Sequence, residues 1–179
     1  SEACNWIVRN FFNGINGKRR NIVVVVHGPS KIGKSVLGTH VKAEVQNKVA
    51  LARLYEDFNP AQFGCDVNSL ILQYNQPCDV GIIVVNEWCY TLRNLQNNMS
   101  APPQNNQVMA THHTESKTAF NNFMDAINNT VGTIAIFTTT ESPESLFSIN
   151  NDTSLMRQGR VDAFIKFSGD GAAVVVNER

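Results

Sequence analysis

The chain has 179 residues, which is the size of one domain at roughly 150 residues per domain. Hydrophobic residues make up 42% and charged residues 17%, which is typical of a globular protein and excludes an extensively disordered one. Fifteen basic and fifteen acidic side chains give a formal net charge of zero. This balance argues against a wholly basic nucleic-acid-binding surface or a polybasic membrane anchor, although a local basic site is compatible with it.

The sequence has no segment that approaches the 18 or so uncharged apolar residues of a membrane-spanning helix. Its first residues lack the pattern of a secretory signal, and it opens on Ser1 instead of Met, which we interpret as a fragment of a longer protein. The four cysteines are not closely paired (Cys4, Cys65, Cys78 and Cys89). Scattered thiols in a chain of this size predict a reduced, intracellular protein of the cytoplasm or nucleus.

Strand-like and helix-like segments alternate, which is the pattern of an α/β protein with a parallel sheet. In the first part of the chain, we expect a helix around 6–15, a strand at 22–26, a helix over 34–48 and a strand at 49–55. These are followed by a strand at 82–85, a loop over 97–107 and a helix over 119–127. The last expected elements are strands at 134–137 and 161–167 and an apolar run at 174–176. The prediction is a three-layer α/β domain with a central, mainly parallel five-stranded sheet. Residues 1–20 are expected to form an N-terminal helix and basic turn, and 21–179 the main domain.

A glycine-rich motif follows the first predicted strand directly. Its residues are Gly28, Pro29, Ser30, Lys31, Ile32, Gly33, Lys34 and Ser35, a full G-x-x-x-x-G-K-S pattern, with Val36 next to it. Glycines let backbone N–H groups converge on phosphate oxygens, and the following helix directs its positive dipole end at the same phosphates. Lys34 would bind the β- and γ-phosphates and the Ser35 hydroxyl would ligate Mg²⁺. The motif predicts a site for ATP and Mg²⁺.

Two polar residues, Asn86 and Glu87, end the strand predicted at 82–85. Glu87 is the candidate general base that would polarise water for attack on the γ-phosphate, and both residues could help to hold the metal with Ser35. Asn86 adds no negative charge where an Asp is usual, so weaker Mg²⁺ binding is expected. The alternative for Glu87 is an acidic residue at a helix N-terminus, favoured by the helix dipole.

Polar residues also follow the strand predicted at 134–137. Thr139, Thr140 or Glu141 could position the attacking water or sense the γ-phosphate. The sequence does not distinguish between these three residues, and we take Thr140 as the predicted catalytic residue. The alternative is that these are ordinary polar residues at the end of a strand.

Two arginines, Arg157 and Arg160, lie just before the strand predicted at 161–167. An arginine supplied to the site of a neighbouring subunit would neutralise charge on the transferring phosphoryl group. The alternative is a solvated pair of surface arginines. We expect the first role for both residues.

With these motifs in this order, residues 18–167 resemble ring-forming ATPases of the AAA+ superfamily. The basic turn at 17–21, His27 before the motif, and the closing 161–167 strand resemble the motor domain of viral superfamily 3 helicases. The competing resemblance is to the BCS1-like and protein-remodelling AAA branch, through 138–162. Only 19 residues follow Arg160, too few for the helical lid of that branch.

The helicase resemblance implies a hexameric ring of identical subunits that translocates on single-stranded DNA or RNA during viral genome replication in a host cell. It also implies a pore loop, for which His112, His113 and Lys117 are candidates through contacts with phosphates. The alternative for that segment is a capped helix start.

The sequence therefore predicts an ATPase, with a helicase motor as the leading function. A protein-remodelling ATPase and a nucleotide-gated binding module with slow hydrolysis are the alternatives.

Overall fold

The computed structural model describes residues 1–14, 21–56, 79–98, 117–150, 160–168 and 173–178. In these ranges the elements are α1 (Glu2–Asn13), β1 (Asn21–His27), the short 3₁₀ helix η2 (Lys34–Val36), α2 (Leu37–Gln46), β2 (Ala52–Tyr55), β3 (Val80–Val85), α4 (Trp88–Asn98), α5 (Lys117–Asn129), β4 (Thr133–Thr139), α6 (Pro143–Asn150), β5 (Ala163–Phe167) and β6 (Ala173–Glu178).

The strands form one mixed sheet in the order β2-β3-β4-β1-β5-β6. The first five are parallel to their neighbours, whereas β6 runs antiparallel to β5. The predicted α/β class is confirmed, but the prediction of five strands is wrong. The short apolar run near the C-terminal end pairs with β5 and adds a sixth, antiparallel edge strand.

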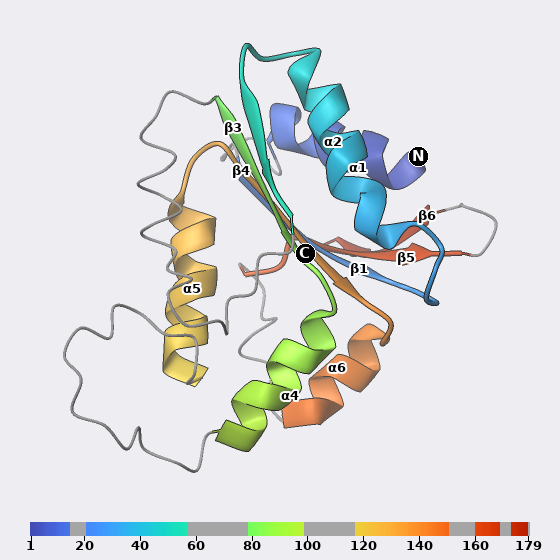
Figure 1. Ribbon diagram of the computed structural model, residues 1–179, viewed down its shortest axis with the longest axis vertical. Helices are drawn as coiled ribbons and strands as arrows, with labels where there is room; N and C mark the ends of the chain where they lie inside the picture. Colours follow the sequence, from blue (N-terminus) through green and yellow to red (C-terminus); the bar gives the residue numbers. More distant parts are fainter. Residues whose placement is uncertain (15–20, 57–78, 99–116, 151–159, 169–172, 179) are drawn as a thin grey trace.

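Helices cover both faces of the sheet. Figure 1 shows α1 and α2 on one side and α4, α5 and α6 on the other. Alternate residues of β1 point to opposite faces, so that Val24 packs in the core beside α1 and α2, and Val25 in the core beside α4 to α6. All seven residues of β1 are buried, which explains why the β-branched run at its centre forms a central strand and not an edge strand.

Two helices were not predicted from the sequence. The first, α4, begins directly after Glu87, and the second, α6, begins at Pro143. Both are short helices that follow the carboxyl ends of β3 and β4, and α6 uses a proline at its first position, where a missing N–H costs nothing. None of the helices in the described ranges is long and apolar enough to cross a membrane.

The order of the strands brings distant parts of the sequence together at one edge of the sheet. Because β3, β4 and β1 are parallel neighbours, the residues that follow Val85, Thr139 and His27 lie at the same, carboxyl edge. In open parallel sheets this edge is where ligands bind. The amino edge, with Asn21 and Thr133, lies at the other end of the same strands.

Candidate phosphate-binding site

The loop after β1 is held in a curled conformation. Lys31 and Gly33 have positive φ values of 64° and 89°, and Gly28 has a φ of 151°. Left-handed residues next to right-handed ones turn successive backbone N–H groups toward a common centre, which is a concave site for an anion. A side chain at Gly28 would not fit, because a Cβ there would lie 2.6 Å from the carbonyl oxygen of Phe167 in β5.

Lys34 is the most informative residue of the loop, because its side chain is only 6% exposed. Its Nζ donates a hydrogen bond of 2.7 Å to the carbonyl oxygen of Gly28 and another to that of Pro29. Burial lowers the pKa of Lys34, and the nearby Glu87 carboxylate raises it. The ammonium group is thus desolvated with hydrogen bonds to neutral acceptors, an environment that an anionic ligand would improve.

Most of the remaining loop is open to solvent. Pro29, Ser30, Lys31, Ser35 and Val36 are exposed. Ile32 is half-buried and packs against the core beside α1 and α2, which anchors the loop to that face of the sheet.

Glu87 lies at the end of β3 with an exposed side chain and a φ of 52°. This left-handed conformation is uncommon for a residue with a side chain and costs on the order of 1–3 kcal/mol. The Thr138 hydroxyl accepts a 3.4 Å hydrogen bond from the Glu87 backbone N–H and donates a 3.0 Å bond to Asn86 Oδ1. The alternative role, an acidic residue before a helix, is also compatible with the structure, because α4 begins at the next residue.

Thr138 was not among the predicted site residues, although it joins the ends of β3 and β4 and is only 2% exposed. Its neighbour Thr139 is fully buried and accepts a 3.1 Å hydrogen bond from the Glu141 N–H. Glu141 pairs with Arg93 and accepts a bond from Ser145, whereas Thr140 is exposed. A signal was present in the sequence, since Thr138 is the first polar residue after the apolar centre of β4.

His27 is a second residue whose position the sequence did not reveal. It ends β1, is 7% exposed, and its Nε2 has no hydrogen-bond partner within the described ranges. Burial lowers the pKa of His27, Glu144 opposes this shift, and Lys166 and Lys34 add to it. A buried imidazole with a lowered pKa therefore lies directly before the phosphate loop.

Arg160 lies at the amino edge, away from the loop. Its guanidinium is 5% exposed and binds both carboxylate oxygens of Asp125 at 2.8 and 2.9 Å, and it also donates to Asn121. Asn128, at the end of α5, donates a 3.2 Å bond to the Arg160 carbonyl. These contacts fasten α5 to the start of β5, so Arg160 is not the solvated surface arginine that was the alternative.

The other predicted residues lie mostly beyond what the structure describes. Arg157, His112 and His113 fall outside the described ranges. Lys117 is the first residue of α5, and its side chain is not described. The predictions of a pore loop and of an arginine finger at Arg157 therefore stay predictions, whereas the Arg160 guanidinium is buried and paired with Asp125 of its own chain.

The predicted metal ligands can be tested against the chemistry of Mg²⁺. Ser35, Asn86 and Glu87 offer hydroxyl, amide and carboxylate oxygens, which are the hard donors that this ion prefers. Within the described ranges, no cluster of three or more His, Cys, Asp or Glu side chains could hold a metal by itself. A magnesium ion that arrives with phosphates needs only one or two protein carboxylates, so the donor set fits.

Comparisons with known proteins show a likeness at the level of the fold. No family model matches the chain, and no curated protein matches it. Among solved structures, a chain of the HORMA:CdnC:Trip13 complex of E. coli MS115-1 is similar, with a TM-score of 0.55 and 13% identity. The match covers 94% of this chain but only 62% of that one. A protein of Pyrococcus horikoshii OT3 also matches, but its TM-score of 0.37 and 9% identity carry no argument.

These comparisons correct the family assignment made from motifs. The solved chain of similar fold belongs to a HORMA:CdnC:Trip13 complex and not to a viral helicase, and at 13% identity it shows the fold alone. The assignment to superfamily 3 helicases and the AAA+ superfamily therefore does not stand, nor does membership of the BCS1-like branch. The physical reason is that the motif covers eight residues and indicates phosphate binding only. It does not determine the family to which the rest of the chain belongs.

The functional prediction is corrected with it. A helicase motor in viral genome replication, with protein remodelling as its alternative, was inferred from the family, and the similar structure is instead part of a complex of proteins. ATP binding and hydrolysis also receive no support from the comparisons. What remains is the geometry of the loop and of its neighbours.

Proposed function

We propose that the carboxyl edge of the sheet binds the phosphate tail of a nucleoside triphosphate, ATP with Mg²⁺, and that Glu87 promotes its hydrolysis. The observation that carries this proposal is the buried Lys34 ammonium, held by the carbonyl oxygens of its own glycine-rich loop. Burial disfavours a charged ammonium whose acceptors are neutral carbonyls, and an anionic ligand would offset that cost.

The roles of the side chains follow from their positions. The loop N–H groups and Lys34 would bind phosphate oxygens, while Ser35 and Asn86 would offer oxygen ligands to Mg²⁺. Mg²⁺, when bound, neutralises charge on the β- and γ-phosphates. Glu87 accepts a proton from the water that attacks the γ-phosphorus, the β–γ bridging bond breaks, and ADP and phosphate leave. Thr138 positions Glu87 through its backbone N–H.

Partners are a separate proposal. The similar chain belongs to an assembly of several proteins, and we propose that this chain also acts within a protein complex. Val36 and Tyr90, 48% and 60% exposed, are apolar side chains near the carboxyl edge that a protein partner could cover.

Self-association into a ring and binding of single-stranded DNA or RNA also stay proposals. Sedimentation with and without nucleotide or oligonucleotide tests both.

Calorimetric titration with Mg·ATP tests the nucleotide site. We expect Lys34→Ala to weaken binding by about 10- to 100-fold, since a hydrogen bond to a charged group contributes roughly 1.5–3 kcal/mol. The matched control is Lys31→Ala, which removes an exposed lysine from the same loop and should change the affinity by less than about threefold. Equal affinities for the wild type and Lys34→Ala would contradict the site.

Phosphate release in the steady state tests the role of Glu87. The variant Glu87→Gln keeps the shape of the side chain but cannot accept the proton, and we expect the rate to fall by about 10²- to 10⁴-fold with binding retained. Glu44→Gln, on the exposed side of α2, is the control. If wild-type turnover equals that of Glu87→Gln, the chain binds nucleotide without hydrolysing it.

A further inference from the structure

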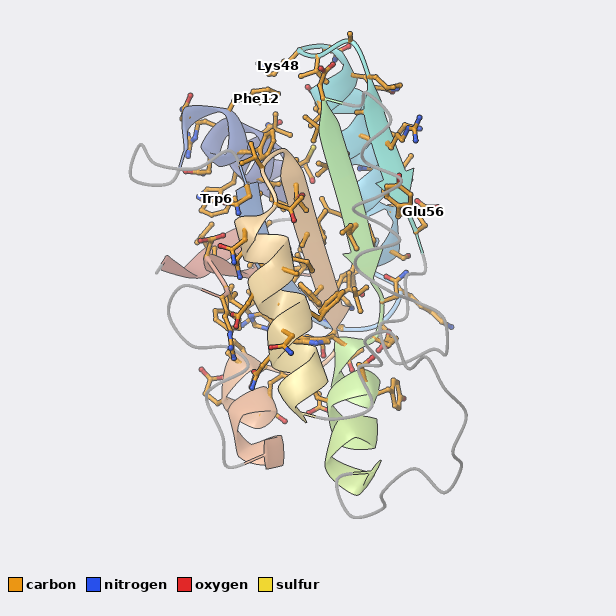
Figure 2. The ribbon with its side chains drawn as sticks, turned by 90° about the vertical axis from the view of Figure 1, so that its left-hand side faces the viewer. Trp6, Phe12, Lys48 and Glu56 are labelled. Atoms are coloured by element: carbon orange, nitrogen blue, oxygen red, sulfur yellow. The ribbon has the colours of Figure 1, made fainter. Side chains whose placement is uncertain are left out.

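A hollow lies between α1 and the β5–β6 pair, on the same side of the sheet as Ile32 of the phosphate loop. It is a cavity of about 270 Å³, close to the lower end of the roughly 300–1,000 Å³ that ligand pockets occupy. One wall is a single face of α1, with Glu2, Asn5, Trp6 and Arg9 at helical spacing. The other wall is apolar and includes Ile165 and Val175. Figure 2 shows Trp6 on the side of α1 that faces these strands.

Two contacts connect this hollow with the loop. Phe167, the last residue of β5, lies against Gly28 and pairs in the sheet with Ala173, which lines the hollow. The Ala173 N–H donates a 3.4 Å bond to Glu2 Oε2, so the first turn of α1 lies at the same edge (Figure 1). Since β6 is two strands from β1, the separation across the sheet is about 10 Å.

Both features also lie on one face of the sheet. Ile32 of the loop, Trp6 of α1, and Ala173 and Val175 of β6 all pack against the core cluster that lies beside α1 and α2. A ligand with phosphates in the loop can therefore extend along this face into the hollow without crossing the sheet.

The lining has the chemistry that a nucleoside requires. A half-buried indole offers a flat apolar surface, and stacking of a base on an aromatic side chain contributes about 1–3 kcal/mol. The exposed Asn5 has an amide that can both donate to and accept from a base edge. The Glu2 carboxylate, which accepts a bond from the Ala173 N–H, can also accept from ribose hydroxyl groups, as acidic residues do in other nucleotide sites.

We infer that this hollow is the nucleoside subsite, in which the base stacks on Trp6 and the ribose lies toward Glu2. The inference rests on the proposed function, because it takes the phosphate tail of the same ligand to lie in the loop. It adds that the base contributes to affinity and that Trp6 determines this contribution.

Two ligands can distinguish binding at the nucleoside subsite from binding at the phosphate loop. Mg·ATP carries phosphates and a nucleoside, whereas magnesium tripolyphosphate carries phosphates alone. We expect Trp6→Leu to weaken Mg·ATP binding by about 5- to 100-fold and to leave tripolyphosphate binding unchanged, with Trp6→Phe as the control that keeps an aromatic ring. Thermal unfolding of each variant checks that it is folded.

A second measurement does not depend on how well Trp6→Leu folds. Mg·ATP should quench the tryptophan fluorescence of the wild type, tripolyphosphate should not, and Trp6→Phe should lose the quenching while it still binds ATP. If Trp6→Leu binds both ligands like the wild type, or if ATP binds the wild type no tighter than tripolyphosphate, the inference is wrong and the phosphate site stands. If neither ligand binds the wild type, the proposed function fails and the subsite with it.

Discussion

The two edges of the sheet each contain a buried cation, and the two are held in different ways. At the amino edge, Arg160 has both oxygens of the Asp125 carboxylate and the Asn121 side chain as acceptors. At the carboxyl edge, Lys34 donates to the neutral carbonyls of Gly28 and Pro29. Arg160 is thus paired with a carboxylate of its own chain, whereas Lys34 bonds to backbone carbonyls beside an open loop, with the Glu87 carboxylate near it.

This difference separates a structural cation from one suited to a ligand. Two guanidinium–carboxylate bonds in fixed geometry fasten a helix to a strand. A desolvated ammonium among neutral dipoles stabilises the fold little, and its charge remains for an anion. The same type of buried charge therefore has opposite consequences at the two ends of the same strands.

The largest expected effect concerns stability at the two edges. Arg160→Met should lower the free energy of unfolding by about 3 kcal/mol, because it removes the guanidinium that bonds to Asp125 and Asn121. We take the lower end of the usual 3–5 kcal/mol range because the Asp125 side chain is 46% exposed. Lys34→Met should be neutral or stabilising, because it removes a buried charge. Urea unfolding of both variants measures the contrast, and equal destabilisation would contradict it.

The next prediction compares alanine substitutions of two glycines, one at each edge of the sheet. A Cβ at Gly28 would lie 2.6 Å from the Phe167 carbonyl, and one at Gly132 would lie 2.9 Å from the Asp79 carbonyl. Both glycines have positive φ, so alanine at either position should cost about 1–3 kcal/mol of stability. Only Gly28→Ala should also weaken binding of Mg·ATP in calorimetric titration. A similar loss of affinity in Gly132→Ala would mean that both act through general destabilisation.

A smaller effect compares two buried threonines in β4. Thr138 at the carboxyl edge bonds to Asn86 and Glu87, whereas Thr133 starts the strand at the amino edge. Thr138→Val should cost about 1 kcal/mol of stability, the usual value of a hydrogen bond, and should lower the rate of phosphate release because Glu87 loses a contact that positions it. Thr133→Val should leave that rate unchanged. Steady-state assays of the two variants decide whether the Thr138 hydroxyl matters to the site.

The smallest effect is a pH dependence at the carboxyl edge. Because the pKa of His27 is lowered in the folded chain, the unfolded chain binds more protons than the folded chain as the pH falls below about 6.5. Stability should therefore decrease over this range, with Glu144 opposing the shift and Lys166 and Lys34 adding to it. Chemical unfolding at several pH values measures the slope, and His27→Gln should flatten it. An unchanged slope in the variant would assign the pH dependence to other groups.

Prediction from sequence succeeded where the local signal was strong. The β-branched run of β1 and the apolar spacing of α5 predicted a buried strand and a helix, both confirmed within a few residues. The helix α4 was missed although its buried Trp88, Cys89 and Leu92 have helical spacing, and α6 was missed because its eight residues offer little periodicity. The prediction of five strands failed because the pairing of β6 with β5 depends on a reversal that hydrophobic spacing does not encode.

The candidate site was predicted in part for a related reason. Gly28, Gly33 and Lys34 form a local motif, so their proximity follows from their spacing in the sequence. The contacts of Thr138 with Asn86 and Glu87 join residues some fifty positions apart, and only the order of strands brings them together. The environment of Arg160 is decided by Asp125 on a distant helix, which a pattern read along the chain cannot supply.

The amino-acid sequence by itself determined the α/β class, the buried central strand and a glycine-rich loop suited to phosphate, because backbone propensity and burial patterns act over neighbouring residues. The tertiary structure alone decided which buried cation bonds to a carboxylate, which hydroxyl supports Glu87, and where α1 and the β5–β6 pair leave a hollow. These depend on the contacts that the fold creates between distant segments, since desolvation and pairing of a charge are set by whatever the fold places around it.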